Sequence, residues 1–352
     1  MTRQLKYFEA IREAQDQCLA ADPSVVVMGL GVPDPRAIFG TTAGLAEKYG
    51  PKRVMDIPLS ENAMTGVCIG AALNGMRPVL THQRLDFALL SMEQIVNQAA
   101  KWHYMFGGQS SVPLVIRMII GRGWGQGPQH SQSLHSWFAH IPGLKVIMPT
   151  TAYDAKGLLI AAIEDNNPVI SIEHRWLFGI PDAVPENMYR SPIGKVRILR
   201  EGTDISLVSC SYMAMESLRA AEKLADLGID AEVVDLATLR PLDEAGILRS
   251  VEKTGRLVAI DGAGVGFGVS AEILALATEH GFGLLKRAPV RIGLPDHPTP
   301  TSPALADGYY PRHGHIVACV LKMFKQPVDD RLFDPPTERR LDQPDPTFIG
   351  PF

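Results

Sequence analysis

The sequence predicts an α/β protein with two doubly wound domains, the second smaller than the first. Short apolar runs typical of buried strands alternate with helical segments from the start of the chain. The alternation breaks at residues 178–195, which hold three prolines, and then restarts. A chain of 352 residues is long enough for two hydrophobic cores. We therefore expect domains at residues 1–185 and 186–325, followed by a proline-rich carboxyl-terminal arm at 326–352.

The first domain carries one unusual helix among ordinary elements. Residues 63–73 have almost no polar side chain, so we expect a buried helix that begins at Glu61, is capped by Ser60 and ends at Asn74-Gly75. Further helices are expected at 89–105 and 152–164. The expected strands are short apolar runs, at 24–28, 78–81, 112–120, 145–148 and 168–172.

The second domain repeats this order on a smaller scale. Its expected strands are 204–210, 231–235, 256–261 and 290–292. Its expected helices are 214–227, one after Pro241, and 270–277. Because strands and helices alternate again, we expect a second sheet with helices on both faces.

The composition limits the classes of function. An apolar fraction of 46%, a charged fraction of 20% and a net charge of -4 fit a globular protein without the basic surface that nucleic acid requires. The four cysteines have no CxxC spacing, which favours reduced thiols over a zinc site or disulfides. The amino end lacks a signal core, and no run of about eighteen apolar residues occurs. We expect a cytoplasmic protein that neither binds nucleic acid nor spans a membrane.

Glu61 is the first candidate for chemistry, because it stands at the mouth of the apolar helix. Burial raises the pKa of a carboxyl group and a helix amino end lowers it, so such a group is able to hold or share a proton near neutral pH. A capping carboxylate on a solvated turn explains the local sequence equally well.

A glycine-rich segment supplies the second candidate. Glycines at 121, 123, 125 and 127 follow an expected strand and lead to His130, which therefore lies at the usual ligand edge of an α/β sheet. Histidine exchanges a proton near neutral pH, whereas the alternative interpretation of the segment is a flexible turn. A second run at 262–268 is weak evidence for nucleotide binding, because the third glycine of a GxGxxG motif falls on Phe267.

With Glu61, Phe87 and His130 in view, the chain resembles the β subunits of the thiamine-diphosphate-dependent 2-oxo acid dehydrogenases, the pyruvate, branched-chain and acetoin group. The resemblance covers nearly all of residues 1–325. It is most specific at residues 56–75, at Asp86-Phe87 with 92–101, and at 129–157. It implies a transketolase-like pyrimidine-binding domain followed by a transketolase carboxyl-terminal domain, and an enzyme that is active only with an α subunit.

The resemblance also implies roles for individual residues. The glutamate matching Glu61 hydrogen-bonds the aminopyrimidine ring of the cofactor and promotes the tautomer that takes the thiazolium proton. The aromatic matching Phe87 stacks on that ring, and the histidine matching His130 assists proton transfer near the substrate. Ile57 and Gln83 match further cofactor contacts. Family members also hold a potassium ion through main-chain oxygens, at positions matching Leu114, Ala162, Ile163, Asp165 and Asn167.

One missing motif bears on the partners. Thiamine enzymes hold the diphosphate and its magnesium with a GDG motif, which this sequence lacks. The resemblance therefore implies that an α subunit holds the magnesium, in an α2β2 heterotetramer with thiamine diphosphate at the α/β interface. A lipoylated acyltransferase core is the expected acceptor of the acyl group from a 2-oxo acid.

Departures from the family pattern leave alternatives open. Thr81 stands where relatives commonly have an acidic residue, and Arg84, Arg122 and Arg175 are able to meet a carboxylate or a sugar phosphate, although surface ion pairs are their ordinary role. A split transketolase-like enzyme or a carboligase that passes a ketol or acyl group to an aldehyde is the second hypothesis. A non-catalytic scaffold subunit is the third. The sequence identifies neither the 2-oxo acid nor the acceptor.

Overall fold

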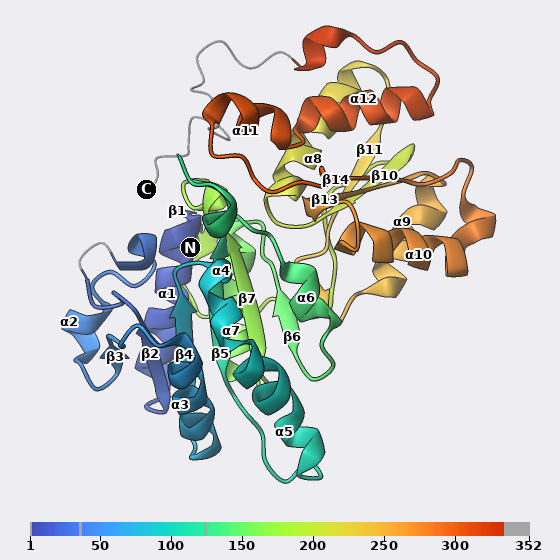
Figure 1. Ribbon diagram of the computed structural model, residues 1–352. Helices are drawn as coiled ribbons and strands as arrows, with labels where there is room; N and C mark the ends of the chain where they lie inside the picture. Colours follow the sequence, from blue (N-terminus) through green and yellow to red (C-terminus); the bar gives the residue numbers. More distant parts are fainter. Residues whose placement is uncertain (1, 35–36, 124, 334–352) are drawn as a thin grey trace.

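The computed structural model describes residues 2–34, 37–123 and 125–333, and it confirms the α/β fold class with two large mixed sheets (Figure 1). The predicted arm at 326–352 lies mostly outside the described residues. The described residues form no helix that is both long and apolar enough to cross a membrane.

The first sheet has seven strands in the order β12-β6-β7-β5-β4-β2-β3. All neighbouring pairs are parallel except β12 with β6, and β12 comes from the second half of the chain. The strands are β2 (Val25–Gly29), β3 (Val54–Met55), β4 (Arg77–His82), β5 (Val115–Ile120), β6 (Lys145–Ile147), β7 (Val169–His174) and β12 (Thr238–Arg240).

Alternate strand residues explain why helices cover both faces of this sheet. Val25, Val27 and Val79 pack in one cluster with α1 and α7, whereas Val26 and Leu80 pack in another with α3. The helices and turns of this domain are α1 (Tyr7–Ala21), η1 (Ala37–Gly40), α2 (Leu45–Tyr49), α3 (Glu61–Leu73), η4 (Pro128–His130), α6 (His135–His140), α7 (Ala152–Glu164) and η5 (Arg175–Leu177). A small antiparallel sheet joins β1 (Thr2–Lys6) to β8 (Pro181–Pro185).

The second sheet has five strands in the order β14-β13-β10-β11-β9, with β9 antiparallel to its neighbour. Helices α8 and α12 pack on one face, and α9 and α10 pack on the other. The strands are β9 (Arg197–Arg200), β10 (Ile205–Ser209), β11 (Ala231–Asp235), β13 (Leu257–Gly264) and β14 (Val290–Leu294). The helices are α8 (Tyr212–Asp226), α9 (Glu244–Thr254), α10 (Val269–Gly281), η6 (Phe282–Leu284), α11 (Pro303–Tyr309), α12 (His313–Met323) and η7 (Asp330–Phe333).

The prediction of a single α-helix at residues 89–105 is wrong. The structure divides this region into α4 (Leu85–Ala88), η2 (Leu89–Ser91), a π-helical turn η3 (Gln94–Ala99) and α5 (Ala100–Met105). A π-turn inserts one extra residue into the helical path, which periodicity alone does not reveal. The domain limits at 185 and 325 stay predictions.

Candidate functional site

The predicted site lies at one edge of the seven-stranded sheet, where parallel strands end. Glu61 is the first residue of α3 after β3, Phe87 lies in α4 after β4, and His130 ends η4 after β5. The rings of Phe87 and His130 are in contact, with centroids 5.4 Å apart and planes at 88°. The structure therefore brings two of the three residues into contact and places Glu61 at the same edge.

Helix α3 differs from its prediction in burial. Its buried residues are Thr65, Cys68, Ile69 and Ala72, which form one face. The other face is open: Val67 is 54% exposed, and Leu59 just before the helix is 76% exposed. The expectation of a helix buried on all sides is therefore wrong for the single chain. Glu61 is half-buried at the rim of this open apolar face.

Ile57 and Gln83 flank the site but differ in what they contact. Ile57 is half-buried and packs against the core. Gln83 donates its side-chain N–H to the carbonyl of Leu30 at 3.0 Å, so its amide supports the loop that follows β2. Asp56 supports the same loop, because its Oδ1 accepts from the backbone N–H of Gly31 at 2.8 Å.

Three of the four glycines in the glycine-rich segment, Gly121, Gly123 and Gly127, lie against remote side chains, whereas a Cβ on Gly125 would meet no atom within 4 Å. A Cβ on Gly121, whose φ is +96°, would lie 2.7 Å from the ring of His174. A Cβ on Gly123 would lie 2.4 Å from Arg175 Nη1, and one on Gly127 would lie 2.3 Å from Thr301 Oγ1. A flexible turn does not explain these three positions.

His130 follows this segment directly and is half-buried. Its backbone N–H donates to the carbonyl of Gly127 at 3.2 Å. Two residues later, the side chain of Gln132 donates to Asp86 Oδ1 at 2.9 Å, beside Phe87. Burial raises the pKa of Asp86 above its usual range, although the hydrogen bonds from Gln132 oppose the shift.

The arginines that sequence reasoning singled out are not on an open surface. Arg84, Arg122 and Arg175 are 4%, 1% and 0% exposed. Arg122 donates to the carbonyls of Pro300 and Thr301 in the second domain. The surface ion-pair role expected for these three arginines is therefore wrong.

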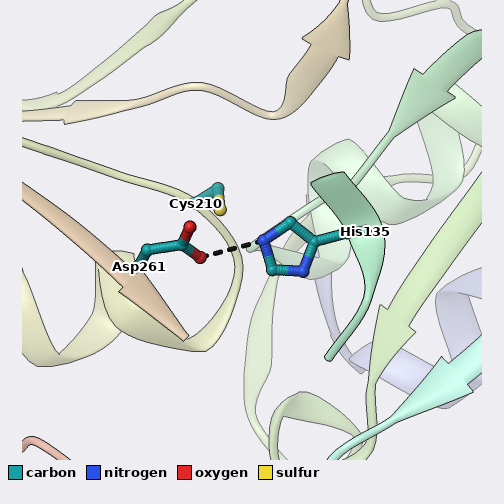
Figure 2. Close-up of side chains that lie close together, drawn as sticks. All are labelled: His135, Cys210 and Asp261. Carbon is teal, nitrogen blue, oxygen red and sulfur yellow. Dashed lines mark hydrogen bonds and ion pairs between the residues drawn. The ribbon is translucent and has the colours of Figure 1, made fainter. Parts of the chain in front are cut away.

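A buried group of possible metal ligands joins the two domains. His135 Nε2 lies 2.9 Å from Asp261 Oδ1, with Cys210 beside them (Figure 2). Burial, together with the charges of Asp261 and Asp235, raises the pKa of the Cys210 thiol well above its usual range. Burial alone would raise the pKa of Asp261, but His135 and backbone N–H donors lower it. The geometry fits a hydrogen-bonded interdomain contact better than a metal centre.

The guanidinium group of Arg77 contacts two of the five predicted potassium ligands. Arg77 Nη1 donates to the carbonyls of Ile163 and Asp165, at 3.0 Å in each case. The carbonyl of Leu114 accepts from the backbone N–H of Val169 at 2.9 Å, and that of Ala162 accepts from Asp165 at 3.3 Å. A guanidinium thus already meets two of the five carbonyl oxygens, and the potassium site, including Asn167, stays a prediction.

The residues at the sheet edge fit one end of a heteroaromatic cofactor. A carboxylate is able to hydrogen-bond a ring nitrogen, an aromatic side chain offers a stacking surface, and a histidine is able to move a proton. Glu61 begins the helix whose apolar surface the single chain leaves exposed at Leu59 and Val67. The geometry therefore suits half of a site that a second chain completes.

Comparisons with known proteins agree with this geometry. Residues 3–180 match the family "Transketolase, pyrimidine binding domain", and residues 194–316 match "Transketolase, C-terminal domain". The chain is 44% identical over 335 residues to the β subunit of acetoin:2,6-dichlorophenolindophenol oxidoreductase from Cupriavidus necator, covering 92% of this chain and 99% of that one. It is 39% identical over 321 residues to the pyruvate dehydrogenase E1 β subunit of Rickettsia felis, covering 91% and 98%.

A solved structure described as "Split gene transketolase, inactive beta4 tetramer" has the same fold. The TM-score is 0.75, with 24% identity, and the match covers 91% of this chain and 98% of that one. At this identity the likeness bears on the fold alone.

Proposed function

The chain belongs to the E1 β subunits of the thiamine-diphosphate-dependent pyruvate and acetoin dehydrogenase group, and we propose that it supplies the half of a shared active site that holds the pyrimidine end of the cofactor. The observation that carries the proposal is the meeting of Phe87 and His130 at the sheet edge that also presents Glu61.

Each residue has a proposed part in this half-site. Thiamine diphosphate, when bound, supplies the nucleophilic carbon that attacks a 2-oxo acid. Glu61 holds a proton at the pyrimidine ring nitrogen, Phe87 stacks on that ring with Ile57 beside it, and Gln83 supports the loop at the rim. His130 moves a proton near the substrate, and contact with Phe87 fixes the orientation of its imidazole ring.

The proposed partner is an α subunit that brings the diphosphate and magnesium site. The absence of a GDG motif and the exposure of Leu59 and Val67 beside Glu61 support this. We propose an α2β2 heterotetramer, with a lipoylated acyltransferase core as acceptor. A single β chain is then expected to have no turnover.

The transketolase-like alternative loses its main support in the structure. Arg84, Arg122 and Arg175 were its candidates for binding a sugar phosphate, and all three are buried against protein atoms. The retained Glu61, Phe87 and His130 also speak against a scaffold without catalysis.

The test is an assay of the complex co-expressed with its α partner. Release of carbon dioxide is followed with a panel of 2-oxo acids, while neutral hydroxyketones and ketose phosphates are followed by loss of substrate. We expect carbon dioxide from a 2-oxo acid, and we expect Glu61→Gln to lower its rate by at least about 100-fold, as loss of a proton-transfer group does. Cleavage of a ketose phosphate without carbon dioxide would instead select the transketolase-like enzyme.

A matched control separates the chemistry of Glu61 from charge removal in general. Glu47 is an exposed glutamate of α2, away from this edge. Glu47→Gln is expected to keep the wild-type rate. Wild-type decarboxylation in the Glu61→Gln complex would defeat the assigned role.

A further inference from the structure

Residues 84–87, at the start of α4, are hydrogen-bonded to the chain on both sides of His130. Arg84 Nη1 donates to the carbonyl of Gly121 at 2.8 Å, at the start of the glycine-rich segment. Asp86 Oδ1 accepts from Gln132, from its side chain at 2.9 Å and from its backbone N–H at 3.3 Å. Between these two anchors, His130 meets Phe87.

Gln126 is the acceptor that the surrounding donors share. Its Oε1 accepts from Arg84 Nη2, from Arg175 Nη1 at 2.9 Å and from the backbone N–H of Gly123 at 3.0 Å. Gln126 is half-buried, whereas both arginines are buried. One neutral amide oxygen therefore binds two cationic side chains and the backbone of its own segment.

The electrostatics make this shared oxygen important for geometry. Burial, and then the charge of Arg84, lowers the pKa of Arg175 to about 9. Burial lowers the pKa of Arg84 to about 10, against the opposing charge of Asp86. Both guanidinium groups stay protonated at neutral pH and repel each other in a poorly solvated place. Loss of the common acceptor would favour their separation and release the segment.

We propose that Gln126, Arg84 and Arg175 are positioning residues that hold residues 121–123 and 125–127 so that His130 faces Phe87. The three residues act through His130, so this inference rests on the proposed function. The family match assigns none of them a role. Gly123 fits the arrangement, because a Cβ there would overlap Arg175 Nη1 at 2.4 Å and Gln126 Oε1 at 2.7 Å.

Two substitutions at Gln126 in the α/β complex test the inference. Gln126→Met keeps most of the side-chain volume and removes the acceptor, whereas Gln126→Glu keeps an acceptor oxygen. We expect Gln126→Met to lower kcat at least about tenfold with KM changed less than about twofold, because a small misplacement of a reacting group is costly. Gln126→Glu is expected to stay within about threefold of the wild-type kcat. Gln109→Met, at an exposed glutamine, is the matched control.

Hydrogen exchange gives a readout that does not depend on catalysis. The amides of residues 125–132 in the complex are expected to exchange faster in Gln126→Met than in the wild type and in Gln126→Glu. Wild-type kcat in Gln126→Met overturns the inference, and so does a rise in KM for the 2-oxo acid alone, which would indicate direct substrate contact. If the wild-type complex neither releases carbon dioxide from a 2-oxo acid nor consumes a hydroxyketone, the proposed function fails. The exchange rates then still decide the inference: faster exchange supports it and unchanged exchange overturns it.

Discussion

The two glycine-rich segments, residues 121–127 directly after β5 and residues 262–268 at the carboxyl end of β13 and just beyond it, have different surroundings. In the first, a Cβ on Gly121, Gly123 or Gly127 would come within 2.7 Å of a remote side chain. In the second, a Cβ on Gly264 or Gly266 would meet no atom within 4 Å, and one on Gly268 would lie 2.8 Å from Asp261 Oδ2 and from the carbonyl of Gly264, both close by in the sequence. Phe267 at its tip is 99% exposed.

This difference teaches that the number of glycines does not identify a functional segment. The distinguishing feature is whether side chains from remote parts of the chain close against the backbone. The first segment is surrounded by Arg84, His174, Arg175 and Thr301, and it leads to His130. The second makes a tight connection from β13 into α10.

The largest expected effect comes from adding one methyl group to each segment. Gly123→Ala would place its Cβ against Arg175 Nη1 and disturb the hydrogen bonds of Gln126, so we expect kcat of the complex to fall by about 100-fold. Gly264→Ala meets no atom within 4 Å and is expected to keep kcat and Tm. Steady-state kinetics and thermal unfolding of both variants measure this. Equal behaviour of the two variants would remove the contrast between the segments.

The aspartates that anchor the two segments are expected to respond to substitution in opposite directions. The pKa of Asp86 is raised, chiefly by burial, so wild-type stability falls as pH rises from near 3.8 through the folded pKa. Asp86→Asn keeps an acceptor for Gln132 and is expected to raise Tm by about 2 °C at neutral pH, with no gain below pH about 4.

Substitution of Asp261 is expected to change Tm in the opposite direction. Burial alone would raise the pKa of Asp261, but His135 and backbone N–H donors hold it below the usual value. The charged form therefore stabilises the fold above pH about 4, and this contribution is lost as the pH falls through the lowered pKa. Asp261→Asn is expected to lower Tm at neutral pH by several degrees, about what loss of one partner of a buried pair costs. Tm profiles from pH 3 to 8 that move in the same direction for both variants would contradict this.

The smallest expected effect lies at the tip of the second segment. Phe267 is exposed and has a φ of +58°, a conformation that a glycine adopts without strain. Phe267→Gly is expected to change Tm of the complex by no more than about 1 °C, and upward if strain relief exceeds the added chain entropy. A large loss of stability or of kcat would show that this segment, like the first, is held by specific contacts.

The regular elements of both sheets could be predicted where clear signals bound them. Helix α7 matches its expected limits, because Thr151 caps it by accepting from the backbone N–H of Asp154 at 3.1 Å and Asn167-Pro168 follows its end. β11 also matches. Helix α1 was not predicted, although its buried positions, among them Tyr7, Ala10 and Ile11, have helical spacing. β12 has only three residues and pairs across the chain, so no local pattern reveals it.

The site was predictable only in part for a similar reason. His130 was found from the glycine-rich segment that precedes it and Phe87 through the family resemblance, and the structure places their rings in contact. Arg84, Gln126 and Arg175 converge from well-separated segments, and arginine is ordinarily exposed, so neither spacing nor composition indicates their common contact. Thr81 was suspected of altering substrate choice, but it is buried opposite Arg117 Nη1 at 3.5 Å, within a network that includes Glu173.

The strand β12 makes the two domains poor candidates for exchange between relatives. It leaves the second half of the chain to complete the first sheet, pairing Thr238 with Ile147 and Arg240 with Val146. A fragment that stops at residue 185 would leave β6 as a bare edge, with unpaired N–H and C=O groups open to association with other chains. Exchange of one domain between relatives must therefore keep β6 and β12 matched to each other. The two domains are better regarded as one evolutionary unit than as two.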